Sequence, residues 1–163
     1  MAATVRIVAG EDFTRVANAL RAIDARMPTQ LRKEMRDAVK PFVRQAQQKV
    51  RTLPVAGNAG HTGLRRKVAR GVRATAAVGG RRGSYMRIVT SMPEENQVMI
   101  PRGLDGERGW RHPVFGNRNE WVTQRPIQPG WFVETLSEAR EPMTTALLGV
   151  LQRARDTVAA ARS

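Results

Sequence analysis

The sequence predicts an α+β fold in a single domain that spans residues 1–163. Apolar residues recur at helical spacing in three stretches, near residues 13–23, 31–53 and 132–158. Alternating residues on both sides of a glycine-rich turn predict a β-hairpin between residues 72 and 90. The length of 163 residues is sufficient for one domain with a core. We therefore expect two N-terminal helices, a small antiparallel sheet with a central hairpin, and a long C-terminal helix.

The first third of the chain predicts a short strand and two helices. Residues 4–8 alternate weakly, and Glu11 and Asp12 are the acids that suit the start of a helix through residue 23. The second helix is long, since one apolar stripe runs through Leu31, Met35, Val39, Phe42, Ala46, Val50 and Leu53. Because Pro41 removes a backbone hydrogen bond inside this helix, we expect a kink there.

The middle of the chain predicts a loop, a short helix and the central hairpin. Residues 54–63 are rich in glycine and small residues, so we expect a mobile loop. A short helix follows and ends near Gly71, and the hairpin comes next with a mobile tip at about 79–84. Residues 92–101 fit either a helical turn or a strand, and the sequence does not decide between them.

An aromatic segment, GWRHPVFGNRNEWVTQRPIQPGWFVE at residues 109–134, holds all three tryptophans and two of the four phenylalanines. Glycines and prolines divide it, which predicts strands near 110–115 and 120–123. Aromatic side chains bury a large area, so we expect four of them to lie in the core or in a subunit contact: Trp110, Phe115, Trp121 and Trp131. The final helix then runs from residue 132 to 158, and Pro142 bends it or marks its true start.

The charge of the chain is concentrated in its middle third. The net charge is +14, and residues 32–87 hold fifteen basic residues against Glu34 and Asp37. The rest of the chain is close to neutral. Such a patch attracts phosphate backbones or an acidic protein surface. Six basic residues near the short helix and the hairpin tip are the candidates for this contact: Arg65, Arg66, Lys67, Arg70, Arg81 and Arg82.

No residue pattern indicates catalysis. The chain has no cysteine, and its two histidines, His61 and His112, have no metal-ligand spacing. Gly79–Gly83 lacks the Lys-Ser/Thr of a nucleotide-binding P-loop. We therefore expect a protein that is not an enzyme and binds no cofactor or metal. No apolar run approaches the roughly 20 residues that span a bilayer, so we also expect no membrane partner.

The aromatic segment resembles a known family. Residues 112–118 (HPVFGNR), then WVTQ at 121–124 and PGWF at 129–132, are similar to small minor tail or neck proteins of long-tailed phages that infect high-GC actinobacterial hosts. In that family a region around Phe-Gly precedes a proline-rich passage into a C-terminal helix. The resemblance implies an α+β subunit that assembles into rings where the tail meets the head.

The expected function is therefore structural: a virion protein, made in the bacterial cytoplasm, that joins the head connector to the tail. Its implied partners are further copies of itself, the head connector and the tail-terminator or tail-tube proteins, with possible contact to packaged DNA. The order of the ring, six or twelve, stays open. The alternative is a stand-alone basic protein that binds nucleic acid through its arginine-rich middle third.

Overall fold

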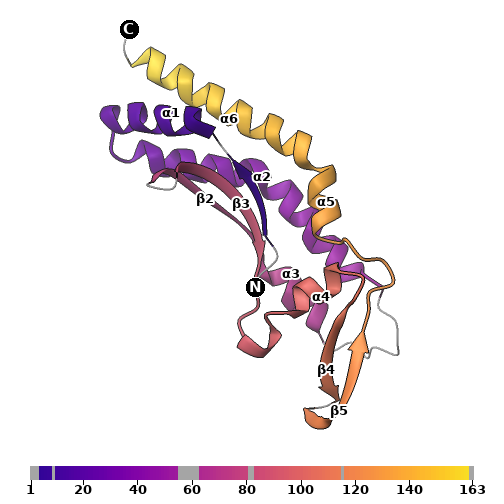
Figure 1. Cartoon of the computed structure of the whole chain (residues 1–163). Helices are drawn as coiled ribbons and strands as arrows, with labels where there is room; N and C mark the ends of the chain where they lie inside the picture. The colour runs from indigo at the N-terminus through magenta and orange to yellow at the C-terminus, as the bar shows by residue number, and fades with distance from the viewer. Residues whose placement is uncertain (1–3, 9, 55–62, 81–82, 115, 162–163) are drawn as a thin grey trace. The chain divides into compact units, whose positions relative to one another are not determined.

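The computed structural model describes residues 4–8, 10–54, 63–80, 83–114 and 116–161. It confirms the predicted α+β fold, with a long second helix, a central hairpin and a long C-terminal helix (Figure 1). Most of loop 54–63 and residues 81–82 of the hairpin tip lie outside the described residues, so the predicted mobility of both segments is not tested.

The elements follow one another closely along the chain. The N-terminal half contains β1 (Thr4–Val8), α1 (Gly10–Ile23), α2 (Met27–Thr52), α3 (Leu64–Gly71), β2 (Val72–Gly80) and β3 (Gly83–Thr90). The C-terminal half contains the 3-10 helix η1 (Glu95–Gln97), α4 (Ile100–Asp105), β4 (Trp110–Val114), β5 (Asn117–Gln124), α5 (Val133–Glu138) and α6 (Arg140–Ala160). The segment left open at residues 92–101 is thus η1 and the start of α4, with no strand.

Contacts divide the chain into two compact units, each made from separate stretches. The first, which we call the hairpin unit, contains Arg44–Arg73 and Val89–Glu138. The second, the helical unit, contains Val5–Val43, Ala74–Ile88 and Ala139–Ser163. The organisation as a single domain stays a prediction.

In the helical unit, α1 and α6 lie side by side (Figure 1). Phe13, Val16 and Leu20 form the buried face of α1, and α6 buries Met143, Leu147, Val150, Leu151 and Ala154. Asp12 and Arg155 form an ion pair of 3.2 Å between the two helices. Apolar burial holds this pair of helices together, since an exposed ion pair contributes little.

Most of a three-stranded sheet with the order β1-β3-β2 belongs to the same unit as these helices. Alternate residues of β3 are buried, namely Ser84, Met86, Ile88 and Thr90. The Ser84 hydroxyl lies 2.8 Å from the Thr14 hydroxyl of α1 and accepts a hydrogen bond from the Gly79 amide at 3.2 Å. The tip end of this hairpin is therefore held against α1 by polar as well as apolar contacts.

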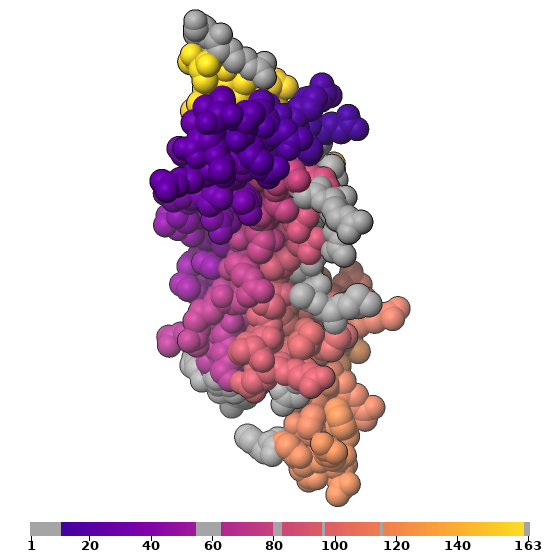
Figure 2. Space-filling view, turned by 90° about the vertical axis from the view of Figure 1, so that its left-hand side faces the viewer, coloured from indigo at the N-terminus to yellow at the C-terminus, as the bar shows by residue number. Residues whose placement is uncertain are grey.

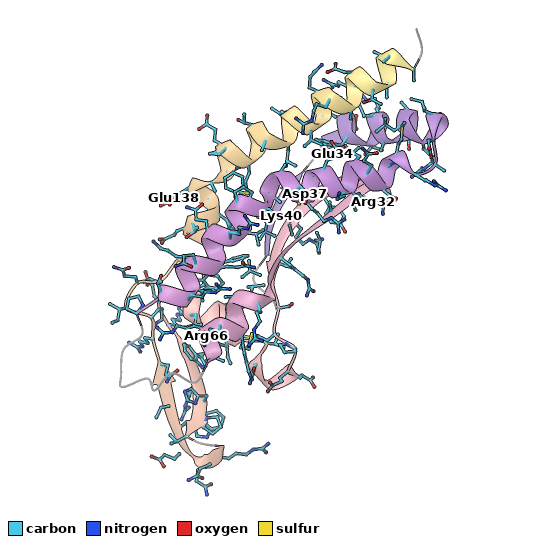
Figure 3. All side chains as sticks on the ribbon, turned by 180° about the vertical axis from the view of Figure 1, so that it is seen from behind. Arg32, Glu34, Asp37, Lys40, Arg66 and Glu138 are labelled. Carbon is cyan, nitrogen blue, oxygen red and sulfur yellow. The ribbon has the colours of Figure 1, made fainter. Side chains whose placement is uncertain are left out.

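Helix α2 keeps the predicted apolar stripe with one change. Six of the seven predicted positions are buried, but Phe42 is only half-buried and the neighbouring Val43 is buried in its place. The helix continues through Pro41 rather than ending there. Its exposed side carries an Asp37–Lys40 ion pair of 2.8 Å, both of whose residues are labelled in Figure 3.

The predicted C-terminal helix is two helices. Helix α5 ends at Glu138 and α6 begins at Arg140, so the prediction of one helix from residue 132 was wrong. Pro142 lies in the first turn of α6, where a missing amide hydrogen breaks no helical hydrogen bond. The second option for Pro142, that it marks the true helix start, is confirmed.

Candidate functional site: an exposed hairpin and a nearby cavity

The β4–β5 hairpin of the hairpin unit carries the aromatic motif. Its strands pair antiparallel from Trp110↔Gln124 to Pro113↔Trp121, and the register shifts between Pro113 and Val114. Every residue of β5 is exposed except Gln124, which is half-buried. Figure 2 shows the orange residues of this hairpin as a narrow projection from their unit. The β5 part of the segment that resembles the phage proteins is thus on the surface, whereas Trp131 and Phe132 at its end are buried.

The base of this hairpin is anchored by two glycines. A Cβ at Gly103 of α4 would overlap the Trp110 side chain, so the strand lies directly on the helix. Gly109 has a φ of +66°, and a Cβ there would overlap the Gln124 carbonyl of the opposite strand. Only glycine combines this conformation with this closeness. The base is therefore fixed to α4, whereas the tip extends into solvent.

Trp121 is exposed but held in one orientation. The residue is 45% exposed to solvent. The indole Nε1–H donates a 2.7 Å hydrogen bond to the Arg118 carbonyl, and the Arg111 guanidinium lies 5.4 Å from the ring centre. A cation over an aromatic face is attracted by the ring quadrupole. A large side chain that is ordered and yet open to solvent is typical of a binding hot spot.

The four candidate aromatics have different surroundings. Trp131 is 1% exposed and contacts Phe132, so it is a core residue, although its Nε1–H has no hydrogen-bond partner among the described residues. Trp110 is half-buried and stacks on His112 at 6.1 Å. The side chain of Phe115 lies outside the described residues. For Trp121, the core alternative was wrong, because the residue is 45% exposed. The subunit-contact alternative stays a prediction.

The predicted basic patch is only partly available to a partner. Arg65 donates a hydrogen bond from its guanidinium to the Leu53 carbonyl after the end of α2. Lys67 pairs with Glu94 at 3.1 Å. Arg66, labelled in Figure 3, and Arg70 are exposed on α3. Arg81 and Arg82 lie outside the described residues, and the nine residues of β2 separate them from α3 along the chain. A single patch of all six residues stays a prediction.

A cavity of about 350 Å³ lies in the hairpin unit, beside the start of α5. Its lining comes from Lys49 of α2, the loop Ile127–Gly130, and Glu134, Thr135 and Glu138 of α5. Gly130 has a φ of +84°, and the Glu134 side chain folds over it. Figure 3 labels Glu138 near the end of α5. The cavity thus combines an apolar edge with two carboxylates.

Asp105 fixes the loop that leads into α5. Its carboxylate Oδ1 accepts hydrogen bonds from the amides of Phe132 at 2.7 Å and Val133 at 3.3 Å, and its carbonyl accepts one from Gly130 at 2.7 Å. Burial raises the pKa of Asp105 above its ordinary value, while the two amide hydrogen bonds act in the opposite direction. Sequence reasoning missed this contact, because nothing local relates residue 105 to residue 132.

No group of three or more histidine and acidic side chains in the described part of the chain lies close enough to hold a metal ion. Among the helices that the structure describes, none is long and apolar enough to cross a membrane. The acidic pair Glu94-Glu95 is engaged at Glu94, which accepts from Lys67 and from the Gln97 amide at 2.8 Å. The hairpin and the cavity are therefore the features best suited to binding.

Comparison with protein-family models, with curated proteins and with solved structures found no match for this chain.

Proposed function

We propose that this protein is a structural component of a tailed-phage virion that forms a ring at the head–tail junction and links the head connector to the tail. The observation that carries the proposal is Trp121, which is held in place on an exposed hairpin within the segment that resembles the phage proteins. An ordered, exposed tryptophan is suited to burial in a subunit contact. A ring needs such a contact between two different surfaces of neighbouring copies.

The charge distribution supports a role against a charged neighbour. Helix α2 exposes Lys33, Arg36 and Arg44, which have no ion-pair partner among the described residues. In the proposed ring these cations contact an acidic face of the connector or the tail, or the phosphate backbone of packaged DNA.

The experiment that tests the proposal has two parts. The mass of the purified full-length protein, alone and with the head connector, is measured by light scattering, and virions that carry a labelled copy are imaged by electron microscopy. We expect a closed ring and a label at the junction of head and tail. A protein that stays monomeric with the connector and is absent from virions contradicts the proposal.

The alternative function, nucleic-acid binding by a stand-alone monomer, is favoured by the same exposed cations of α2. A salt titration with duplex DNA distinguishes the two functions. The alternative predicts strong binding by a monomer, with a salt dependence that flattens by roughly 0.9 per lost phosphate contact when Lys33, Arg36 and Arg44 are changed to glutamine. The ring proposal predicts weak binding to free DNA before and after the change.

A further inference from the structure

We propose that the β4–β5 hairpin of one subunit docks, through its exposed Trp121, into the cavity beside α5 of a second copy of this chain. The inference rests on the proposed ring and names the contact that closes it. Both surfaces belong to the hairpin unit, so the contact is defined without reference to the helical unit.

The β4–β5 hairpin has the character of an anchor at Trp121. This residue lies in the middle of β5 and is 45% exposed. The Arg118 carbonyl and the Arg111 guanidinium fix the orientation of the indole before any partner arrives. Little side-chain entropy is then lost on docking, which favours tight binding by a small contact.

The cavity has the complementary character. Ile127 on its edge is 62% exposed, the largest exposed fraction among the exposed large apolar residues of the described chain. Glu134 and Glu138 are exposed, and neither pairs with a cation within 4.0 Å in the part of the chain that the structure describes. An apolar edge next to two unpaired carboxylates is therefore open to a partner that brings an aromatic ring and cations.

The charges of the two surfaces match in number and sign. The hairpin offers the cations Arg111 and Arg118 together with Glu120, and the cavity offers Glu134 and Glu138 together with Lys49. Bidentate arginine–carboxylate pairs give geometric specificity as well as energy. Since the chain carries a net charge of +14, an acidic surface is uncommon on it, and this one adjoins exposed apolar area.

The hairpin does not occupy the cavity of its own copy. The residues that line this cavity come from α2, the loop at 127–130 and α5, and none of them belongs to β4 or β5. In Figure 1 the hairpin runs away from α5, which begins after the loop at its base. The contact therefore joins different copies in a head-to-tail manner, and such contacts close into a ring when the rotation permits.

Engineered cysteines test the contact directly, because the natural chain has none. The test variant is Asn119→Cys with Ile127→Cys, and both positions are exposed. The full-length protein is oxidised and separated under denaturing, non-reducing conditions. We expect a ladder of dimers, trimers and higher species, since each copy then carries one cysteine on each side of the contact. An intramolecular disulfide would stay in the monomer band, so only bonds between copies contribute to the ladder.

The matched control replaces only the cavity position. Asn119→Cys with Leu148→Cys places the second cysteine on α6, at a residue that is 55% exposed. We expect this control to give dimers at most, through pairing of two tips. Equal ladders from both variants, or no ladder from the test variant, overturn the inference.

A charge reversal provides an independent measurement. Arg111→Glu with Arg118→Glu alters only the hairpin, and Glu134→Arg with Glu138→Arg alters only the cavity. Each variant alone places like charges on both sides of the contact and is expected to lose oligomers in light scattering. In a mixture of the two, each hairpin again meets a cavity of opposite charge, so oligomers should form again. Circular dichroism establishes that both variants are folded.

The outcomes separate this inference from the proposed function. If the unaltered protein forms rings that neither charge reversal affects, the inference fails and the ring function stands. If the unaltered protein forms no ring and the test variant gives no ladder, even in virions, both fail.

Discussion

The strands of the β2–β3 and β4–β5 hairpins both mix apolar with polar and charged residues, but they differ in how much of their surface is buried. Alternate residues of β3 are buried, whereas β5 exposes seven of its eight residues. In β3 the apolar Met86 and Ile88 lie on one face, with Arg87 between them. In β5 the two large apolar residues, Trp121 and Val122, are adjacent and so point to opposite faces. Alternation, rather than the number of apolar residues, decides which hairpin belongs to the core.

The two hairpins also share a device at their bases. A Cβ at Gly71 would overlap the Ser91 carbonyl, just as one at Gly109 would overlap the Gln124 carbonyl. In each case the backbone on the opposite side of the hairpin lies directly against the glycine at the base of the hairpin. The same substitution at the two positions therefore compares a hairpin that supports the core with one that extends from it.

The largest expected effect lies in the core hairpin. Met86 is fully buried, and Met86→Ala should lower the free energy of unfolding by about 2–5 kcal/mol, because it removes apolar contacts and leaves a cavity. Urea denaturation followed by circular dichroism measures this loss. A loss below that of an exposed substitution such as Leu148→Ala would show that β3 does not form part of the core.

The second effect compares the two base glycines. Gly71→Ala should lower the free energy of unfolding by roughly 1–3 kcal/mol, because the strand opposite must move within a packed structure. Gly109→Ala meets a similar overlap with an added left-handed strain, but we expect it to release the β4–β5 hairpin instead of unfolding the chain.

Hydrogen exchange distinguishes these two results. In Gly109→Ala, the amides of residues 110–124 should lose protection while those of α1 and α6 keep it. Gly116→Ala is the control, since Gly116 has a φ of +84° but no atom within 4 Å of an added Cβ. Global loss of protection in Gly109→Ala would mean that the β4–β5 hairpin also supports the core.

The third effect concerns Asp105, which joins α4 to the start of α5. Asp105→Ala removes the acceptor of two amide hydrogens and should lower the free energy of unfolding by about 1 kcal/mol. Asp105→Asn keeps an acceptor oxygen and removes the charge, so it is the matched control.

The pH dependence gives the sign of the charge effect. Because burial raises the pKa of Asp105 above its ordinary value of 3.8, the folded state binds this proton more tightly than the unfolded state. The stabilisation that comes from the tighter binding of this proton in the folded state is therefore fully present below pH 3.8 and is lost as the pH rises through the raised pKa. Relative to Asp105→Asn, the natural protein should lose stability across that window in urea titrations. A relative gain would mean that the amide hydrogen bonds outweigh burial.

Much of the fold could be predicted because its determinants are local. The stripe of α2 and the two strands β2 and β3 are predicted from single segments, and both were confirmed. Close to Pro41, the buried face of α2 contains Val43 and not the predicted Phe42. An ideal helical step does not predict this difference. The apolar spacing continues across the division between α5 and α6, and only Pro142 indicated where α6 starts.

The candidate site was harder to predict because its contacts join distant residues. Aromatic character alone suggested burial for both Trp121 and Trp131, but of the two only Trp131 is buried, where it contacts Phe132. The Asp105–Phe132 and Arg65–Leu53 contacts cross 27 and 12 residues, respectively, and leave no local pattern. From the sequence, Arg65 and Lys67 were assigned to a partner surface. In the structure, Arg65 donates a hydrogen bond to the Leu53 carbonyl and Lys67 pairs with Glu94.

The smallest expected effect on folding is at Trp121, which can be compared directly with the buried Trp131. Trp121→Ala removes an exposed ring, one hydrogen bond and one cation–π contact, so the free energy of unfolding should fall by only about 0.5–1 kcal/mol. Trp131→Ala is the matched control with the same change of side chain, and its loss should be about 3–5 kcal/mol because that ring is buried. Chemical denaturation measures both. If the two losses are equal, Trp121 is packed as tightly as Trp131, and the β4–β5 hairpin is not free to dock into a second copy. If Trp121→Ala instead folds normally and no longer forms oligomers, the exposed tryptophan serves the contact between copies, whereas the buried tryptophan serves the fold.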